Sequence, residues 1–114
     1  NDQRSGSRRA RMETVIAYMQ KNLDKNLRLG DFAAEAGMSI SHFSERFRRQ
    51  TGQSPMAYFI QLRMRLACRL LDLSGKPVKT VALEIGYKDP YYFSRIFKKS
   101  MGISPDQYRE IKKG

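Results

Sequence analysis

The side chains of this chain best suited to chemistry are those that can read the edge of a nucleic-acid base. Arg95 can donate two hydrogen bonds to O6 and N7 of guanine, which is the commonest specific pairing between a protein and a base. Glu45 lies fifty residues earlier and can only accept, so N4 of cytosine is its natural target. Tyr91 can contact a thymine methyl group or donate its hydroxyl to a phosphate. These residue types predict recognition of DNA.

These residues lie on two segments that correspond under the fifty-residue offset. When two phenylalanines of each segment face inward, a helical wheel of about 100° per residue gives three matching outward positions. The pairs are Ser41 with Tyr91, Glu45 with Arg95, and Arg48 with Lys98. The side chains expected at phosphates, which position a protein without specifying a sequence, are His42, Arg48, Arg49, Lys98 and Lys99. Because the outward sets differ, the two segments should read different bases.

Several assignments leave a structural alternative open. Glu45 precedes Arg48 and Arg49 by three and four residues, so an intrahelical ion pair competes with base contact. Tyr92 should pack partly against the core, which leaves Tyr91 free to contact DNA. Basic residues between the two segments form either a solvated face or further phosphate contacts, and among these we expect Arg63 to touch a phosphate.

A repeated pattern of apolar residues and glycines predicts the elements that position these side chains. Each copy reads as a short helix, a glycine turn and a second helix, which is a helix-turn-helix, and one residue is inserted in the second copy between Gly86 and Phe93. The expected helices span about 8–24, 29–36, 40–50, 55–73, 78–85 and 90–100, followed by a short one from Ser104–Pro105. The inward residues expected include Ile40, Phe43 and Phe47 in the first copy, and Phe59, Leu62, Leu66, Leu70 and Leu73 between the copies. The fold class predicted is all-α, with seven helices.

The expected organisation is two helix-turn-helix subdomains joined by one helix. The bounds are a flexible linker over 1–7, subdomains over 8–54 and 75–112, and a connecting helix over 55–74. A connecting helix of this length is a rod of about 28 Å. One turn of DNA spans about 34 Å, so we expect the helices at about 40–50 and 90–100 to enter successive major grooves.

Composition restricts the classes of function. Lys and Arg total 22 against 11 Asp and Glu, a net charge of +11 that favours nucleic acid first and an anionic membrane surface second. No apolar run approaches the roughly 18 residues of a membrane span. One Cys and one His leave no internal disulfide and no zinc site, so we expect no metal and no cofactor. There is no acid/base pair, nucleophile arrangement or phosphate-binding glycine loop, so we expect no enzyme. A non-specific architectural nucleic-acid-binding protein is the alternative.

Five short motifs resemble the C-terminal signature of AraC/XylS-type transcription regulators. They are Gly86-Tyr87-Lys88-Asp89, Tyr92-Phe93-Ser94-Arg95, Phe97-Lys98-Lys99, Gly102-Ile103-Ser104-Pro105 and Tyr108-Arg109. The segments 29–58 and 63–71 fit the same family, although Arg28 stands where many relatives have a Ser or Thr cap.

The resemblance implies a bacterial, cytoplasmic, nucleoid-associated regulator that binds double-stranded promoter DNA and contacts RNA polymerase, usually as an activator. An effector or dimerisation domain would lie elsewhere in the full-length protein. The positions that the resemblance places at or near the bases are Ser41, Ser44, Glu45, Pro90, Tyr91 and Arg95.

Overall fold

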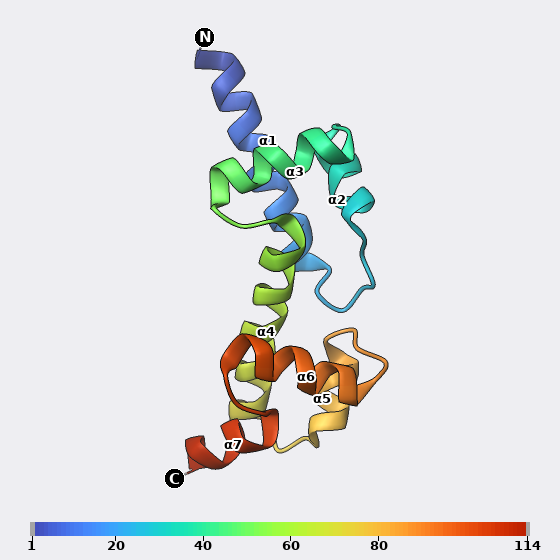
Figure 1. Cartoon of the computed structure of the whole chain (residues 1–114), viewed down its shortest axis with the longest axis vertical. Coiled ribbons are helices and arrows are strands. Elements are labelled where there is room, and N and C mark those ends of the chain that lie inside the picture. The colour runs from blue at the N-terminus through green and yellow to red at the C-terminus, as the bar shows by residue number, and fades with distance from the viewer. Residues whose placement is uncertain (1, 114) are drawn as a thin grey trace. The chain divides into compact units, whose positions relative to one another are not determined.

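The computed structural model describes the backbone of residues 2–113 and the side chains of residues 11–111. Within these bounds the chain forms seven α-helices and no strand (Figure 1). The helices are α1 (Asp2–Lys21), α2 (Leu29–Ala36), α3 (Ile40–Thr51), α4 (Pro55–Leu73), α5 (Val78–Glu84), α6 (Pro90–Met101) and α7 (Pro105–Lys113). The predicted all-α class is confirmed, and from α2 onward the bounds agree with the predicted ones to within one residue where a range was predicted.

The first helix differs most from its prediction. It begins at Asp2, where a flexible linker over 1–7 was expected, and ends at Lys21 rather than at residue 24. Among the described side chains of α1, the first buried one is Met12, and the sequence before it is mostly polar, so apolar periodicity could not predict where the helix begins. A helix extends at little cost beyond its buried stripe once it has nucleated. At the other end, Asn22 Nδ2 donates to the carbonyl of Tyr18 at 2.7 Å.

The chain divides into two compact units, which we call the first lobe (1–60) and the second lobe (61–114), with the boundary inside α4. In the first lobe the Phe32 ring packs 5.2 Å from Phe59 and edge-on to Tyr18 at 6.4 Å, which joins α2 to α4 and α1. The Phe47 ring lies 5.5 Å from Phe43 and edge-on to Tyr58 at 5.4 Å. These aromatic contacts hold α3 against the rest of its lobe.

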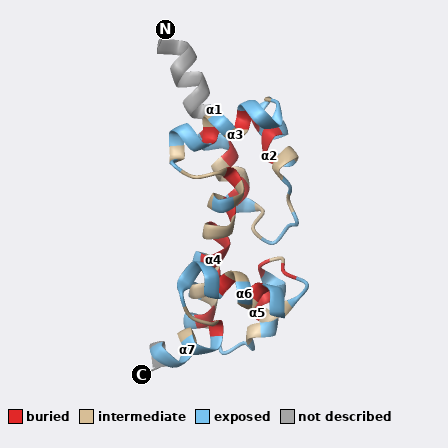
Figure 2. Ribbon diagram, viewed as in Figure 1, coloured by how far each residue is buried: buried red, intermediate tan, exposed pale blue. Residues whose placement is uncertain are grey.

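The second lobe repeats the α3 arrangement in α6. The Phe97 ring lies 5.8 Å from Phe93 and edge-on to Tyr108 at 5.8 Å. Buried, half-buried and exposed positions coincide one for one between residues 41–50 and 91–100. Figure 2 shows that both α3 and α6 carry buried as well as exposed segments. The internal repeat read from the sequence is therefore a repeat of packing as well.

The ends of the two corresponding helices are fixed by local hydrogen bonds. Ser39 Oγ accepts from the His42 backbone N–H at 3.2 Å at the start of α3. Asp89 Oδ1 accepts from the Tyr91 N–H at 2.9 Å at the start of α6. Both helices end at glycines with positive φ, Gly52 at +81° and Gly102 at +87°.

The start of α2 is held in a way that the sequence did not predict. Arg28 offers no side-chain cap, but the Asp31 carboxylate accepts from the Arg28 backbone N–H at 2.8 Å. This is the reciprocal half of a capping box, with the acidic residue in the first turn. The missing Ser or Thr is therefore partly compensated three residues later.

Two residues expected in the core are exposed. Ile40 is 50% exposed: it lies on the same face as the two buried phenylalanines, but in the first turn of α3, where it passes over Gly30. Leu73 is 80% exposed because it is the last residue of α4 and lies about 200° around the helix from buried Leu71. Periodicity identifies the face of a helix but not how far the core extends along it.

Candidate nucleic-acid interface

The second helix of each helix-turn-helix, α3 in the first lobe and α6 in the second, presents one face to solvent, and most of the predicted site residues lie on these two faces. The exposed ones are Ser41, His42, Glu45, Arg48 and Arg49 on α3, and Tyr91, Arg95, Lys98 and Lys99 on α6. Ser44 and Pro90 are half-buried. The basic pairs at 48–49 and 98–99 occupy the last turns of their helices, where positive charge is favourable beside the helix dipole.

In the first lobe, the predicted base-reading residue Glu45 already has a partner on its own helix. Arg49 Nη2 lies 2.8 Å from Glu45 Oε1, and both side chains are about two-thirds exposed, at 69% and 66%. The ion-pair alternative left open by the sequence therefore exists in the structure. The pair lies at the surface, so water and salt weaken it, and DNA can compete for either member.

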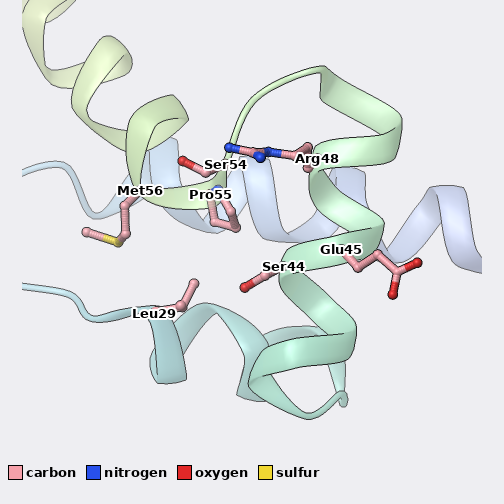
Figure 3. Close-up of a pocket in the computed structure, with 7 residues that line it drawn as sticks. All are labelled: Leu29, Ser44, Glu45, Arg48, Ser54, Pro55 and Met56. Carbon is pink, nitrogen blue, oxygen red and sulfur yellow. The ribbon is translucent and has the colours of Figure 1, made fainter.

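A surface groove in the first lobe collects three of the predicted residues. It is lined by Leu29, Ser44, Glu45, Arg48, Ser54, Pro55 and Met56. In Figure 3, Ser44 points into the groove and Glu45 points away from it. Arg48 extends from α3 toward Ser54 in the same view. Ser44 thus faces the groove on the side of Leu29, while the Glu45 carboxylate stands clear on the exposed face.

In the second lobe, the predicted base reader lies against an aromatic ring. The Arg95 guanidinium carbon is 5.8 Å from the centre of the Tyr92 ring, and Tyr92 is 45% exposed. This separation is within the range of cation–π attraction. Tyr91, at 80% exposure, points to solvent beside it. The prediction that Tyr92 packs partly and Tyr91 stands free is confirmed.

The turn before α6 contains a buried cluster that sequence reasoning missed. Tyr87 is 7% exposed, and its ring lies 6.0 Å from Tyr92 and 5.5 Å from Phe93. The guanidinium carbon of Arg63 lies over the same Tyr87 ring, 4.8 Å from its centre. The signal available in the sequence was the aromatic residue directly after the turn glycine, Gly86, in the copy that carries the inserted residue.

The burial of Arg63 contradicts the phosphate contact expected of it. Its side chain belongs to α4 and is only 7% exposed, so it cannot extend to a phosphate as expected. A helical wheel drawn from leucines alone missed this, because a buried cation needs an aromatic or acidic partner that only the folded chain reveals. Burial raises the pKa of Tyr87, and the hydrogen bond and positive charge of Arg63 oppose that rise. The Tyr87 hydroxyl therefore stays protonated at neutral pH.

The part of the chain that the structure describes contains neither a metal-binding cluster nor a membrane-spanning helix. Within it, no three His, Cys, Asp or Glu side chains gather where they could hold a metal ion. None of the described helices combines the length and apolar character needed to cross a membrane.

Comparison with protein families identifies the repeat. A family described as a helix-turn-helix domain matches residues 32–111, which includes both repeated segments. The MmsAB operon regulatory protein of Pseudomonas aeruginosa is 44% identical over 99 residues, covering 87% of this chain and 32% of that protein. The arabinose operon regulatory protein of Escherichia coli K12 is 34% identical over 100 residues, covering 87% and 34%. The chain thus spans about a third of the length of these relatives.

Solved structures agree with this assignment. The DNA-binding domain of the global transcriptional factor AdpA, solved in complex with a target DNA, is 33% identical, with a TM-score of 0.83 over 88% of this chain and 90% of that one. The C-terminal domain of AraT, a response regulator from Geobacillus stearothermophilus, is 31% identical, with a TM-score of 0.85 over 89% and 84%. The predicted family resemblance is confirmed: this chain belongs to the AraC/XylS family of helix-turn-helix DNA-binding domains.

Proposed function

We propose that this domain reads two unlike DNA boxes, one with α3 and one with α6, and thereby regulates transcription. The observation that carries the proposal is the one-for-one match of burial between the two helices, combined with different chemistry on their exposed faces. Equal packing would present both helices to DNA in the same manner. Unequal outward residues, Glu45 in one and Arg95 in the other, would then select different bases.

The contacts divide by chemistry. We assign base reading to Ser41, Ser44, Glu45, Pro90, Tyr91 and Arg95. We assign phosphate contacts to His42, Arg48, Arg49, Lys98 and Lys99, which are all exposed. Arg95 has the strongest case, because its guanidinium can make a bidentate contact with guanine. Ser41 and Ser44 have short side chains, so the first box should be read less sharply.

The names of the relatives support a regulatory role for the whole protein. An arabinose operon regulator and an activator from Bacillus subtilis, Btr, both match this chain, the second at 38% identity over 85 residues. We propose that the protein containing this domain activates transcription in the bacterial cytoplasm, in association with the nucleoid. RNA polymerase would be its protein partner, and an effector or dimerisation domain would lie outside this chain. We expect no catalytic activity from the domain itself.

Selection of binding sites from random duplex DNA, at near-physiological salt, tests the proposal. We expect two unlike short boxes about one helical turn apart, as α3 and α6 would produce if they entered successive major grooves. Enrichment of a single box would show that one lobe contacts phosphates without reading bases. Tight, salt-sensitive binding without any enrichment would contradict the proposal and favour a non-specific architectural protein.

Salt dependence separates the two kinds of contact. Lys98→Ala should weaken binding to every sequence and reduce the slope of log affinity against log salt by about one. Ser41→Ala is the matched control, because it removes no charge and should leave the slope unchanged. An unchanged slope in the Lys98 variant would remove this residue from the phosphate set.

A further inference from the structure

Four side chains of the second lobe form a continuous stack that leads from the core to the surface. Arg63 lies 4.8 Å from the Tyr87 ring, Tyr87 lies 6.0 Å from the Tyr92 ring, and Tyr92 lies 5.8 Å from the Arg95 guanidinium. Exposure rises along it, from 7% at Arg63 and Tyr87 to 45% at Tyr92. The inner half is fixed by burial, so the ring on which Arg95 rests has a defined position.

This stack matters because an exposed arginine on a helix has many rotamers. Contact with DNA requires the guanidinium to adopt one of them, at an entropic cost. A guanidinium that lies against an aromatic face keeps its N–H groups at the edge of its plane, where they can still bind a base. The Tyr92 ring can therefore restrict the rotamers of Arg95 while its guanidinium N–H groups remain available for hydrogen bonds.

Among the side chains described in the first lobe, there is no equivalent arrangement. Under the fifty-residue offset, His42 stands in the place of Tyr92 and Glu45 in the place of Arg95. Glu45 is held instead by Arg49, at 2.8 Å, on the same exposed face. The segment between the turn glycine and the next helix is one residue shorter before α3 than before α6, so the stack is specific to the second lobe.

We propose that Tyr92 is a positioning residue for Arg95, and that Arg63 and Tyr87 fix Tyr92 from beneath. The stack holds the guanidinium in an orientation from which it binds guanine, and so raises discrimination at that base rather than general affinity for DNA. This inference rests on the proposed function for its consequence at the base. The stack itself is a property of the free domain.

The first test is therefore made without DNA. In the NMR spectrum of the free domain, the Tyr92 ring current should shift the Arg95 Hδ and Hε signals upfield. The shift should persist in Tyr92→Phe and disappear in Tyr92→Leu. Arg95 signals at random-coil positions in the unsubstituted domain would overturn the proposal whether or not the domain reads DNA.

The second test is a double-mutant cycle on DNA. Affinities are measured for the selected site and for the same site with the guanine replaced, using Tyr92→Leu, Arg95→Ala and the double variant. Tyr92→Leu should reduce discrimination between the two duplexes by about two- to five-fold, the range expected of an exposed cation–π contact. It should cause no further loss when Arg95 is already alanine. An equal loss in the Arg95→Ala background would show that Tyr92 contacts DNA itself and would overturn the proposal.

Two variants guard against a purely structural effect. Phenylalanine at position 92 should retain discrimination, whereas pentafluorophenylalanine, which has a similar shape but a reversed ring quadrupole, should lose it. Equal discrimination by these two would assign Tyr92 to packing alone. Gln50→Leu, at an exposed position of α3 for which no DNA contact is proposed, should leave discrimination at this guanine unchanged. Failure of the unsubstituted domain to discriminate would instead contradict the proposed function, which separates the two failures.

Discussion

The two lobes share a packing scheme and differ in what they do with its surface. Each holds the second helix of its helix-turn-helix, α3 or α6, by a buried phenylalanine pair and an edge-on tyrosine, Phe47 with Tyr58 and Phe97 with Tyr108. On the exposed side, the first lobe pairs an acid with a base within one helix, while the second rests an arginine on a tyrosine. A repeated core can therefore carry two helices that recognise different bases, because exposed positions can change without affecting the packing.

The largest effect should come from the shared core. Phe47→Ala and Phe97→Ala each remove a ring that is fully buried, so each should lower the free energy of unfolding by about 3–5 kcal/mol. Urea titration followed by amide NMR should show the damage concentrated in the lobe that carries the substitution. Lys98→Ala, an exposed neighbour, is the control and should change stability by less than about 0.5 kcal/mol. Equal disruption of both lobes by either phenylalanine variant would show that the two lobes do not unfold as separate units.

The next largest effect should come from the stack of Arg63, Tyr87, Tyr92 and Arg95 in the second lobe. Arg63→Met keeps the length of the side chain but removes the cation above Tyr87, and should cost about 2 kcal/mol of stability. The salt dependence of DNA binding should not change. Arg65→Met, at an exposed position of the same helix, is the control and should leave stability almost unchanged. A lower salt slope in the Arg63 variant, with no loss of stability, would return this residue to the phosphate contacts.

Alkaline pH should distinguish the lobes through Tyr108. Burial raises the pKa of Tyr108 to about 12, and hydrogen bonds with Cys68 and Asp72 add to the rise; the Asp72 contact is 3.1 Å. Because this pKa is higher in the folded chain than the ordinary value of about 10, the protonated hydroxyl stabilises the fold. That stabilisation is complete below pH 10 and is lost as the pH rises toward 12.

Melting temperatures measured between pH 9 and 12 would test this expectation. Tyr108→Phe carries no phenolic proton, so its melting temperature should fall less steeply than that of the unsubstituted domain. Tyr58→Phe is the matched control from the first lobe and should leave the dependence on Tyr108 intact. Identical slopes for Tyr108→Phe and the unsubstituted domain would contradict the assignment.

The smallest effect concerns the ion pair of the first lobe. Glu45→Gln and Arg49→Gln both break an exposed i,i+4 pair, so each should cost only about 0.3–0.5 kcal/mol of stability. Only Glu45→Gln should also change base preference, at one position of the first box. Site selection with both variants makes the comparison. The same preferences in both would assign Glu45 to the ion pair alone.

Local signals in the sequence were sufficient to predict most of the scaffold. The helix ends depend on residues within a few positions of them, so the sequence alone is enough to locate these ends. The signals are Ser39 as a cap, Ser54–Pro55 at the start of α4, and glycines at the ends of α2, α3 and α6. The predictions for the start of α1 and for the burial of Ile40 and Leu73 are wrong. The spacing of apolar residues identifies the buried face of a helix, but it does not show where along the helix the buried face or the helix itself ends.

The candidate site was predictable in its residues but not in its pairings. A helical wheel is enough to place Glu45 and Arg95 outward. It cannot show that Arg63, 24 residues before Tyr87, lies over that ring, because this contact joins α4 to a turn. The choice of Arg49 rather than Arg48 as the partner of Glu45 likewise depends on rotamers.

The most direct test of the central claim is a base-by-base affinity profile. Binding of the unsubstituted domain and of Arg95→Ala would be measured on every single-base variant of the selected site. We expect Arg95→Ala to lose about 1–3 kcal/mol at the original site, with preference relaxed at one position of one box and the other box unaffected. A loss of equal size on all sequences would make Arg95 a phosphate contact and contradict the account of two lobes that read different bases.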